Sequence, residues 1–397
     1  MKKIGIATVY TGFNYGSCLQ AYASQQFISS MGYDTTLLWY NDGLIRGRDI
    51  RIKKLIGMVI RTFWRPKLFK KTFLTYRNSL KKEINNETKK YFLEFQSNKL
   101  KVKKCSWKGL KKFANDADTL ACICGSDQIW NATNIYIDPI FYLRFAPKNK
   151  RVAYAPSFGK EFIPKYNKNI IKRYIADFDY ISVREEQGVN IVKQLINREV
   201  QSVLDPTLLL NKVQWLECIN EENDLPEEYI LVYFLDNPTE VAVSYIAEVY
   251  EKFNIPIISI PYKFKELSKF DNLQYRNAGP EQFIDLINNA KFVCTDSFHG
   301  MIFSVNLNTP FYIFQRNYGT ATDQSSRIVS ILEKLKLKER FVSEVYSNDI
   351  NKDKINVEIN FEESNKLLQE EREKSIRYLS NAFSSIEIKN KRGNYER

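Results

Sequence analysis

Short apolar runs alternate with amphipathic stretches in the first half of the chain, and each apolar run ends in a polar loop. The run "KIGIATVY" ends at "TGFNYGS", and residues 16–32 then have the spacing of a helix that closes near Gly32. Further apolar runs occupy 33–40, 119–124, 151–155, 179–183 and 200–204. Strands separated by helices predict a mostly parallel α/β sheet whose strand-end loops gather at one edge.

The second half repeats this pattern after a polar, turn-rich stretch. Strands are expected at 229–235, 255–260, 291–295 and 310–314, with helices between them. Apolar residues three and four apart predict one long helix near the C-terminus. We therefore predict two α/β domains that face each other across a cleft, divided as follows: an N-terminal domain over 1–212, a linker over 213–227, a C-terminal domain over 228–359, and a C-terminal helix and tail over 360–397.

Composition narrows the class of protein. Of 397 residues, 44% are hydrophobic, which is enough for two buried cores. The first residues do not have the pattern of a signal peptide, and no apolar run approaches the length needed to cross a bilayer. The six cysteines are scattered without the spacing of a zinc site. We expect reduced thiols and a cytoplasmic protein.

The positive charge is concentrated in one segment. The chain has a formal net charge of +13, while residues 44–104 alone hold 19 Lys/Arg against 4 Asp/Glu, a local excess of 15. Within this predicted basic insertion, residues 52–63 place apolar side chains at helical spacing. Two interpretations stay open. The helix inserts its apolar face into an acidic membrane surface, or it packs on its own domain and its basic face is solvated.

The only histidine of the chain, His299, lies in "KFVCTDSFHG" directly after a predicted strand. Asp296 or Ser297 can cap the helix that follows, which places His299 in its first turn. Free N–H groups and the helix dipole favour an anion there, so His299 is suited to give a proton to a bound anionic substrate. The alternative is a hydrogen-bonded histidine without a catalytic role.

Six blocks of the sequence together resemble the polysaccharide pyruvyl transferase family. They occur in order over residues 1 to about 335: "GFNYGSCLQAYA", "CGSDQIWN", "AYAPSFG", "ISVREEQG", "LDPTLLL" and "TDSFHGMIFSVNLNTPF". The resemblance implies a GT-B-like fold, phosphoenolpyruvate as donor, and a sugar in a polysaccharide or its lipid-linked precursor as acceptor. It also implies that a pyruvate ketal forms across two hydroxyls and that phosphate is released.

The resemblance assigns the donor site to the C-terminal domain. His299 matches the family's histidine and is expected to be the proton donor, and Arg184 in "SVRE" matches the arginine that holds the donor. The alternative for Arg184 is a surface residue paired with Glu185 or Glu186. Several family members carry an arginine where this chain has Ser297. Either the helix start and Arg184 suffice to hold the phosphate, or another cation substitutes, for which Arg316 and Arg327 are the candidates. The residues expected to bind the donor are Arg184, Ser297, Phe298, Gly300, Arg316 and Arg327.

The acceptor is expected on the N-terminal side of the cleft. Asp127 in "GSDQ" either orients or deprotonates a sugar hydroxyl or caps a short helix, and the two interpretations are left open. The acceptor-binding residues that we predict lie in strand-end loops and are Asn14, Gly16, Ser126, Gln128, Trp130 and Phe158. Trp130 and Phe158 offer a sugar a flat apolar face, unless they belong to the core.

Two other functions fit part of the sequence. One is a GT-B glycosyltransferase with a nucleotide-sugar donor, although paired acidic residues for a ribose are not evident. The other is a non-enzymatic protein that binds polyanions, which explains the charge but not the polar strand-end loops. The expected partners are phosphoenolpyruvate, a sugar acceptor and an acidic membrane surface, with no nucleic acid, no cofactor and no metal.

Overall fold

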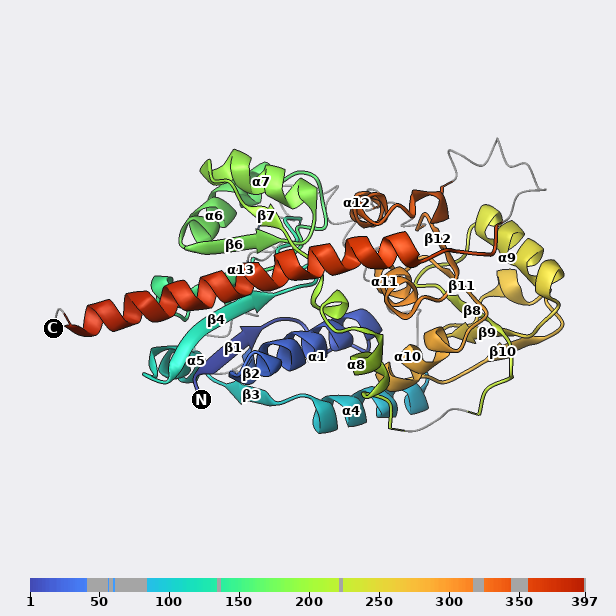
Figure 1. The fold of residues 1–397 in the computed structure, drawn as a ribbon, viewed down its shortest axis with the longest axis horizontal. Helices are drawn as coiled ribbons and strands as arrows, with labels where there is room; N and C mark the ends of the chain where they lie inside the picture. Colours follow the sequence, from blue (N-terminus) through green and yellow to red (C-terminus); the bar gives the residue numbers. More distant parts are fainter. Residues whose placement is uncertain are drawn as a thin grey trace.

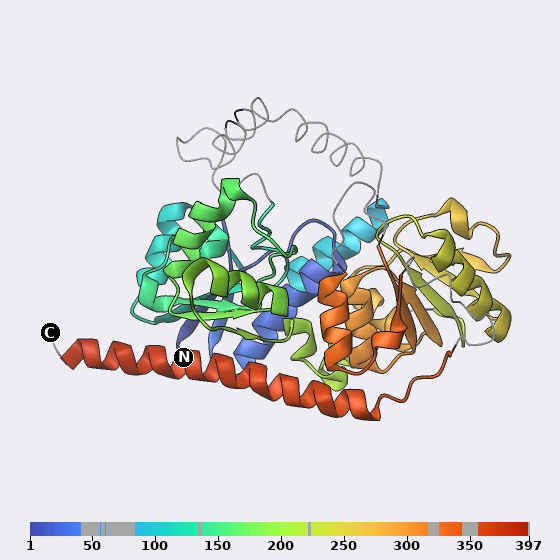
Figure 2. The same cartoon turned by 90° about the horizontal axis from the view of Figure 1, so that it is seen from above.

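The computed structural model describes most of the chain. The described residues are 1–40, 56, 60, 84–133, 137–220, 224–316, 325–343 and 356–395. They form two parallel α/β units that lie side by side, with one long helix running along both of them (Figures 1 and 2). None of the helices in this part of the chain is both long enough and apolar enough to cross a membrane.

The first unit is built on a parallel sheet with the order β3-β2-β1-β4-β5-β6-β7. Its strands are β1 (Lys3–Ala7), β2 (Asp34–Tyr40), β3 (Val102–Cys105), β4 (Thr119–Gly125), β5 (Arg151–Tyr154), β6 (Tyr180–Val183) and β7 (Gln201–Ser202). The chain order reverses between β1 and β4, which is the switch point where such sheets bind ligands beyond the strand ends. β3 was not among the predicted strands because it is a short edge strand whose sequence, VKKC, has two adjacent lysines and no alternation of apolar and polar residues.

Helices cover the first sheet. They are α1 (Tyr15–Ser30), α4 (Asn86–Lys99), α5 (Trp107–Asn115), α6 (Lys165–Ala176) and α7 (Glu186–Ile196). Three of these helices, α1, α4 and α5, begin at a capping side chain. Asn14 caps α1 by accepting the Ser17 N–H at 3.0 Å. Nearly all of α1 is buried, so this helix lies inside the molecule rather than on its surface.

The second unit repeats the design with the order β10-β9-β8-β11-β12-β13. Its strands are β8 (Ile230–Tyr233), β9 (Ile257–Ile260), β10 (Leu273–Tyr275), β11 (Phe292–Thr295), β12 (Phe311–Phe314) and β13 (Phe341–Val342). Its helices are α9 (Glu240–Phe253), α10 (Pro280–Asn288), α11 (Phe298–Leu307) and α12 (Ser326–Lys334). The order reverses between β8 and β11, so the loop before α11 lies at the second switch point.

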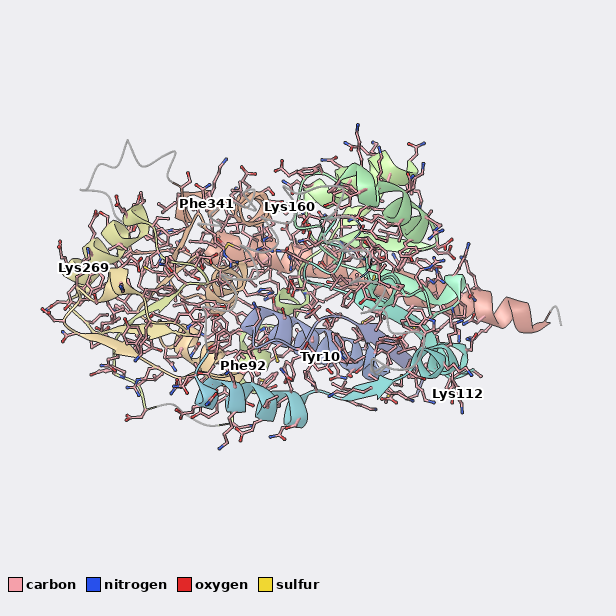
Figure 3. The ribbon with its side chains drawn as sticks, turned by 180° about the vertical axis from the view of Figure 1, so that it is seen from behind. Tyr10, Phe92, Lys112, Lys160, Lys269 and Phe341 are labelled. Atoms are coloured by element: carbon pink, nitrogen blue, oxygen red, sulfur yellow. The ribbon has the colours of Figure 1, made fainter. Side chains whose placement is uncertain are left out.

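The first turn of α1 joins the two units. The Tyr15 ring stacks on Phe283 of α10 with centroids 4.5 Å apart, and its hydroxyl donates to the Ala278 carbonyl at 2.7 Å. Phe92 of α4 also packs on the Tyr15 ring, and Figure 3 labels Phe92 beside α1. The buried apolar residues therefore form a cluster that continues from one unit into the other.

The long C-terminal helix α13 (Glu362–Tyr395) ties the units together from outside (Figure 2). Tyr378 Oη donates to the Ala153 carbonyl of β5 at 2.9 Å, while Arg372 Nη2 donates to Asn306 Oδ1 of α11 at 2.7 Å. α13 follows the second sheet in sequence but packs on the first. Between the sheets, the region predicted as a linker contains α8 (Lys212–Leu216).

The basic insertion predicted at 44–104 is described only in part. The predicted amphipathic helix over 52–63 lies outside the described residues apart from Ile56 and Ile60, whose side chains are exposed. Residues 86–105 form α4 and β3, and α4 buries Thr88, Phe92 and Phe95. The C-terminal third of the segment is thus part of the first unit's framework.

Candidate active site

His299 is held at the start of α11 by a strand-loop-helix turn. β11 ends at Thr295, and the Ser297 hydroxyl caps the helix by accepting the Gly300 N–H at 3.4 Å. Asp296 has another role: its carboxylate accepts the N–H groups of Leu235 and Asp236 at 2.6 and 3.0 Å, which fixes the loop after β8. His299 is the second residue of the helix, as the sequence predicts.

Gly300 lets this turn pack closely. A Cβ atom at Gly300 would lie 2.5 Å from Thr295 Oγ1 and 3.0 Å from the Tyr233 ring, so only a glycine fits without displacing the strands behind it. Its role is in packing rather than in direct contact with a donor.

Asp205 brings together three side chains from both units. Its Oδ2 accepts hydrogen bonds from Arg184 Nη1 at 2.7 Å and Ser126 Oγ at 2.5 Å, and it lies 3.8 Å from His299 Nε2. Burial alone would raise the pKa of Asp205, but His299, Arg184 and Ser126 outweigh it and hold this pKa well below its usual range. A buried carboxylate of one unit therefore faces the imidazole of the other.

Arg184 is buried, with 3% of its side chain exposed, so it is not the surface residue that the alternative interpretation describes. Its guanidinium lies over the Phe298 ring at 4.5 Å and 3.7 Å from Glu185 Oε2. Glu185 is itself oriented by the Ser157 hydroxyl at 2.7 Å. Within the described part of the chain, Arg184 Nη2 makes no hydrogen bond, so the planar fork keeps a donor for an anion.

Gly16 places the start of α1 against the imidazole. A Cβ atom at Gly16 would lie 2.0 Å from His299 Nδ1, so the two units meet at this contact and any larger residue must displace the ring or α1. Gly16 was predicted to bind the acceptor; the structure places it against His299, and its contact with an acceptor stays a prediction. Asn14, predicted with it, is exposed and serves as the cap of α1.

Asp127 lies near this group but is not a helix cap. It adopts a φ of 68° in the loop after β4, and its Oδ2 accepts the Ser17 hydroxyl at 2.6 Å. Its Oδ1 accepts the N–H of Gln128 at 2.7 Å. Asp127 is partly exposed and adds to the negative field that stabilises the Arg184 guanidinium.

Four of the predicted acceptor residues have partners within the protein. Trp130 and Phe158 are fully buried, and Trp130 stacks on Tyr142 with centroids 5.3 Å apart, so the predicted aromatic sugar platform is wrong. Ser126 is buried and holds Asp205. Gln128 remains partly exposed, and its Oε1 accepts the Asn131 amide at 3.0 Å.

The two arginines proposed as substitutes for the missing family arginine differ in position. Arg327 of α12 has its guanidinium carbon 5.2 Å from the Phe298 ring, and it lines a small cavity together with Arg184 and Asp205. Arg316 instead pairs with Asp236 at 2.5 Å and lies 3.9 Å from Asp296. Arg327 is the better placed of the two, because it lines the cavity that also contains Arg184.

The cavity that contains Arg184, Asp205, Phe298, Arg327 and Lys334, here called the arginine cavity, is nearly closed. Its volume is about 20 Å³, which is room for about one water molecule. Any larger ligand therefore requires the two units that line this cavity to move apart, a hinge motion common in two-domain enzymes.

The sequence did not identify Asp205 as a site residue. "LDPTLLL" was one of the blocks that carry the family resemblance, and Asp205 follows a strand-like run in the same way as Asp127 and Arg184 do. The sequence shows Asp205 as an acidic residue at a strand end, but its contact with His299 depends on how the two units are docked.

Solved structures show the same two-unit fold. A protein of Listeria monocytogenes described as a UDP-N-acetylglucosamine 2-epimerase superposes with a TM-score of 0.51 at 10% identity, covering 92% of this chain and 90% of the other. The UDP-GlcNAc 2-epimerase of Methanocaldococcus jannaschii gives 0.49 at 12% identity, covering 93% and 92%. The predicted GT-B-like fold is confirmed. A comparison with curated protein sequences found no match.

A model of one protein family covers most of the chain. The model described as Polysaccharide pyruvyl transferase matches residues 14–318, a range that includes Gly16, Arg184, Asp205 and His299. The resemblance drawn from six sequence blocks is therefore confirmed. The chain belongs to the polysaccharide pyruvyl transferase family and is a transferase enzyme.

Proposed function

We propose that this enzyme transfers the enolpyruvyl group of phosphoenolpyruvate to two hydroxyls of a sugar, forming a pyruvate ketal and releasing phosphate. The observation that carries the proposal is the group of His299, Asp205 and Arg184 at the meeting point of both units. Phosphoenolpyruvate is an enol ester that needs one proton and several cations. The group supplies both kinds of residue at one place.

His299 is the proton donor in this proposal. Its Nε2 faces the Asp205 carboxylate at 3.8 Å and makes no hydrogen bond to any described residue, so it is available to a ligand. The imidazolium gives its proton to the methylene carbon of the donor. The carbon that bears the phosphate then becomes oxocarbenium-like, and Asp205 stabilises the charged ring before the transfer.

Cations of the arginine cavity hold the two anionic groups of the donor. Arg184 presents its fork to the carboxylate or phosphate, and Arg327 replaces the arginine that the family resemblance places at Ser297. The N-terminus of α11 adds its N–H groups and the positive end of its dipole.

The acceptor completes the reaction in two steps. One sugar hydroxyl adds to the oxocarbenium-like carbon and loses its proton, and a second hydroxyl then displaces phosphate from the same carbon. The ketal keeps the methyl group that received the proton from His299. Asp127, which is partly exposed beside the start of α1, is the proposed group that orients or deprotonates a hydroxyl.

Phosphate release from phosphoenolpyruvate tests this proposal. His299→Ala should abolish release in the presence of an acceptor, while phosphoenolpyruvate still raises the melting temperature because Arg184 and Arg327 remain. Release that continues at the wild-type rate in this variant would contradict the catalytic assignment. Stabilisation by a uridine or guanosine nucleotide, but not by phosphoenolpyruvate, would favour a nucleotide-sugar donor instead.

We extend the proposal to the location of the enzyme: a cytoplasmic protein that meets a lipid-linked acceptor at an acidic membrane surface. The support is the charge of residues 44–104 and the apolar spacing within 52–63. The wild-type protein should float with vesicles of phosphatidylglycerol but not with vesicles of phosphatidylcholine. Reversal of Arg51, Lys53 and Lys54 to glutamate should prevent this, and flotation of that variant would contradict the proposal.

A further inference from the structure

A second, larger cavity lies between α7 of the first unit and α12 of the second, where the two helices face each other in Figure 1. Its volume is about 560 Å³, within the range of about 300–1,000 Å³ that is usual for small-molecule sites. Both units line it: Glu161 and Gln187 belong to the first, and Phe341 and Ser343 to the second. Figure 3 shows Phe341 and Lys160, the neighbour of Glu161, at the same edge of the molecule.

The lining of this α7–α12 cavity is polar and acidic. The carboxylates of Glu161, Glu186 and Glu333 accompany amide and hydroxyl groups, and among the described residues no lysine or arginine lines it. Two of these carboxylates are paired with lysines outside the lining: Glu186 with Lys334 of the arginine cavity at 3.0 Å, and Glu333 with Lys338 at 2.6 Å. Carboxylates accept hydrogen bonds from hydroxyls, and an aromatic ring such as Phe341 offers an apolar face, so the lining suits an uncharged polyhydroxyl ligand.

Two buried polar atoms of the lining lack partners within the described part of the chain. Ser343 is 6% exposed, and its Oγ makes no hydrogen bond there. The same is true of Gln187 Oε1, on the opposite wall. Buried polar groups are nearly always hydrogen-bonded, because an unpaired one costs about 1–3 kcal/mol. Atoms of this kind on both walls of a cavity indicate a ligand with several hydroxyls.

The two cavities differ in charge and adjoin each other. The arginine cavity is lined by three cations, Arg184, Arg327 and Lys334, and by the carboxylates of Asp205 and Glu371, whereas the described lining of the α7–α12 cavity has three carboxylates and no cation. Ser330 of α12 lines both, so a ligand in one lies next to a ligand in the other. Carboxylates repel an anionic donor, so this difference in charge directs the donor to one cavity and leaves the other for an uncharged molecule.

We infer that the α7–α12 cavity is the subsite of the acceptor sugar. This inference rests on the proposed function. It places the acceptor away from Trp130 and Phe158, which are buried in the core. It specifies a pyranose without a negative charge, whose hydroxyls contact the carboxylates and Ser343 and whose apolar face lies on Phe341. An acceptor bound here reaches the donor across Ser330.

Saturation-transfer NMR with methyl glycosides of glucose, galactose, mannose and N-acetylglucosamine tests the inference in the presence of phosphoenolpyruvate. At least one glycoside should receive saturation from the wild-type protein. Val329→Trp, which fills this cavity and does not line the other, should abolish the signal. Glu161→Gln should weaken binding at least about tenfold, the effect of losing a charge-assisted hydrogen bond.

Glu161 is exposed, so its substitution does not disturb the core, and Glu199→Gln is the matched control at an exposed glutamate outside the cavity. Equal glycoside binding by the wild-type, Val329→Trp and Glu161→Gln proteins would overturn the inference, and so would the absence of binding by all four glycosides. A thermal shift with phosphoenolpyruvate alone tests the donor separately. If a glycoside binds in the cavity but phosphoenolpyruvate does not raise the melting temperature, the sugar subsite stands and phosphoenolpyruvate is rejected as the donor.

Discussion

Gly16→Ala tests whether the position of the imidazole, rather than its mere presence, determines activity. The added methyl group would lie 2.0 Å from His299 Nδ1, whereas nonbonded heavy atoms prefer about 3.5 Å, so the ring and α1 must separate by about 1.5 Å. A displacement of about 1 Å in a catalytic group costs about 100-fold in rate. We therefore expect Gly16→Ala to lower phosphate release at least about 100-fold although His299 is still present.

The effect on stability should be modest. Alanine is favoured over glycine inside a helix by about 0.5–1 kcal/mol, while the forced separation costs about 1–3 kcal/mol. The free energy of unfolding should therefore fall by about 1–2 kcal/mol, which leaves the variant folded at 25 °C in a protein of ordinary stability. Urea denaturation followed by tryptophan fluorescence measures this change.

The chain has a single histidine, so NMR reports on it without ambiguity. In protein without a histidine tag, one set of imidazole signals should be present, and it should shift in Gly16→Ala. Gly32→Ala is the matched control: Gly32 has a φ of 91°, with open space around its Cβ position, so alanine is strained there without reaching His299. Unchanged imidazole signals and wild-type phosphate release in Gly16→Ala would refute the packing argument.

Three further outcomes follow from single contacts. Arg184→Lys keeps the charge beside Asp205 but loses the planar fork, so the KM for phosphoenolpyruvate should rise about tenfold or more in steady-state assays, and an unchanged KM would remove Arg184 from the donor site. Burial raises the pKa of Asp296 to about 6, so native protein binds this proton more tightly than unfolded protein, and the free energy of unfolding should fall by about 2 kcal/mol as the pH rises from about 4 to about 6. Asp296→Asn should remove that pH dependence in urea titrations, and its persistence would point to another group. Tyr378→Phe removes the hydrogen bond to Ala153 and should cost about 1 kcal/mol of stability without changing phosphate release, whereas no loss would show that α13 is held by its apolar contacts alone.

Much of the framework of the site was predictable from sequence because it is local. Ser297 caps α11 and places His299 in its first turn, since a strand end followed by a hydroxyl residue has few other conformations. Pro280 begins α10 for a similar reason: its φ suits a helix start and its missing N–H costs nothing there. Gly16 was placed at the cleft by its position in the first strand-end loop.

The aromatic residues show where local reasoning stops. Trp130 and Phe158 follow strand ends in the sequence, as ligand-contacting residues do, yet both are fully buried. The direction of a side chain from an irregular loop depends on which neighbours surround it, and here Tyr142 stacks on Trp130 from a turn that is separate in sequence. The hydrophobic periodicity of a sequence does not encode the direction of such a side chain, because a loop has no regular period.

The sequence by itself determined the alternation of strands and helices, the family, and the placement of a lone histidine at a helix start, because each of these depends on residues that are close in the chain. Only the tertiary structure decided that Asp205 and Arg184 of one unit meet His299 of the other, with Gly16 against the ring. These contacts arise when two separately wound sheets dock through an apolar cluster that continues across both. The docking depends on the shape of whole surfaces, and no short pattern in the chain records it.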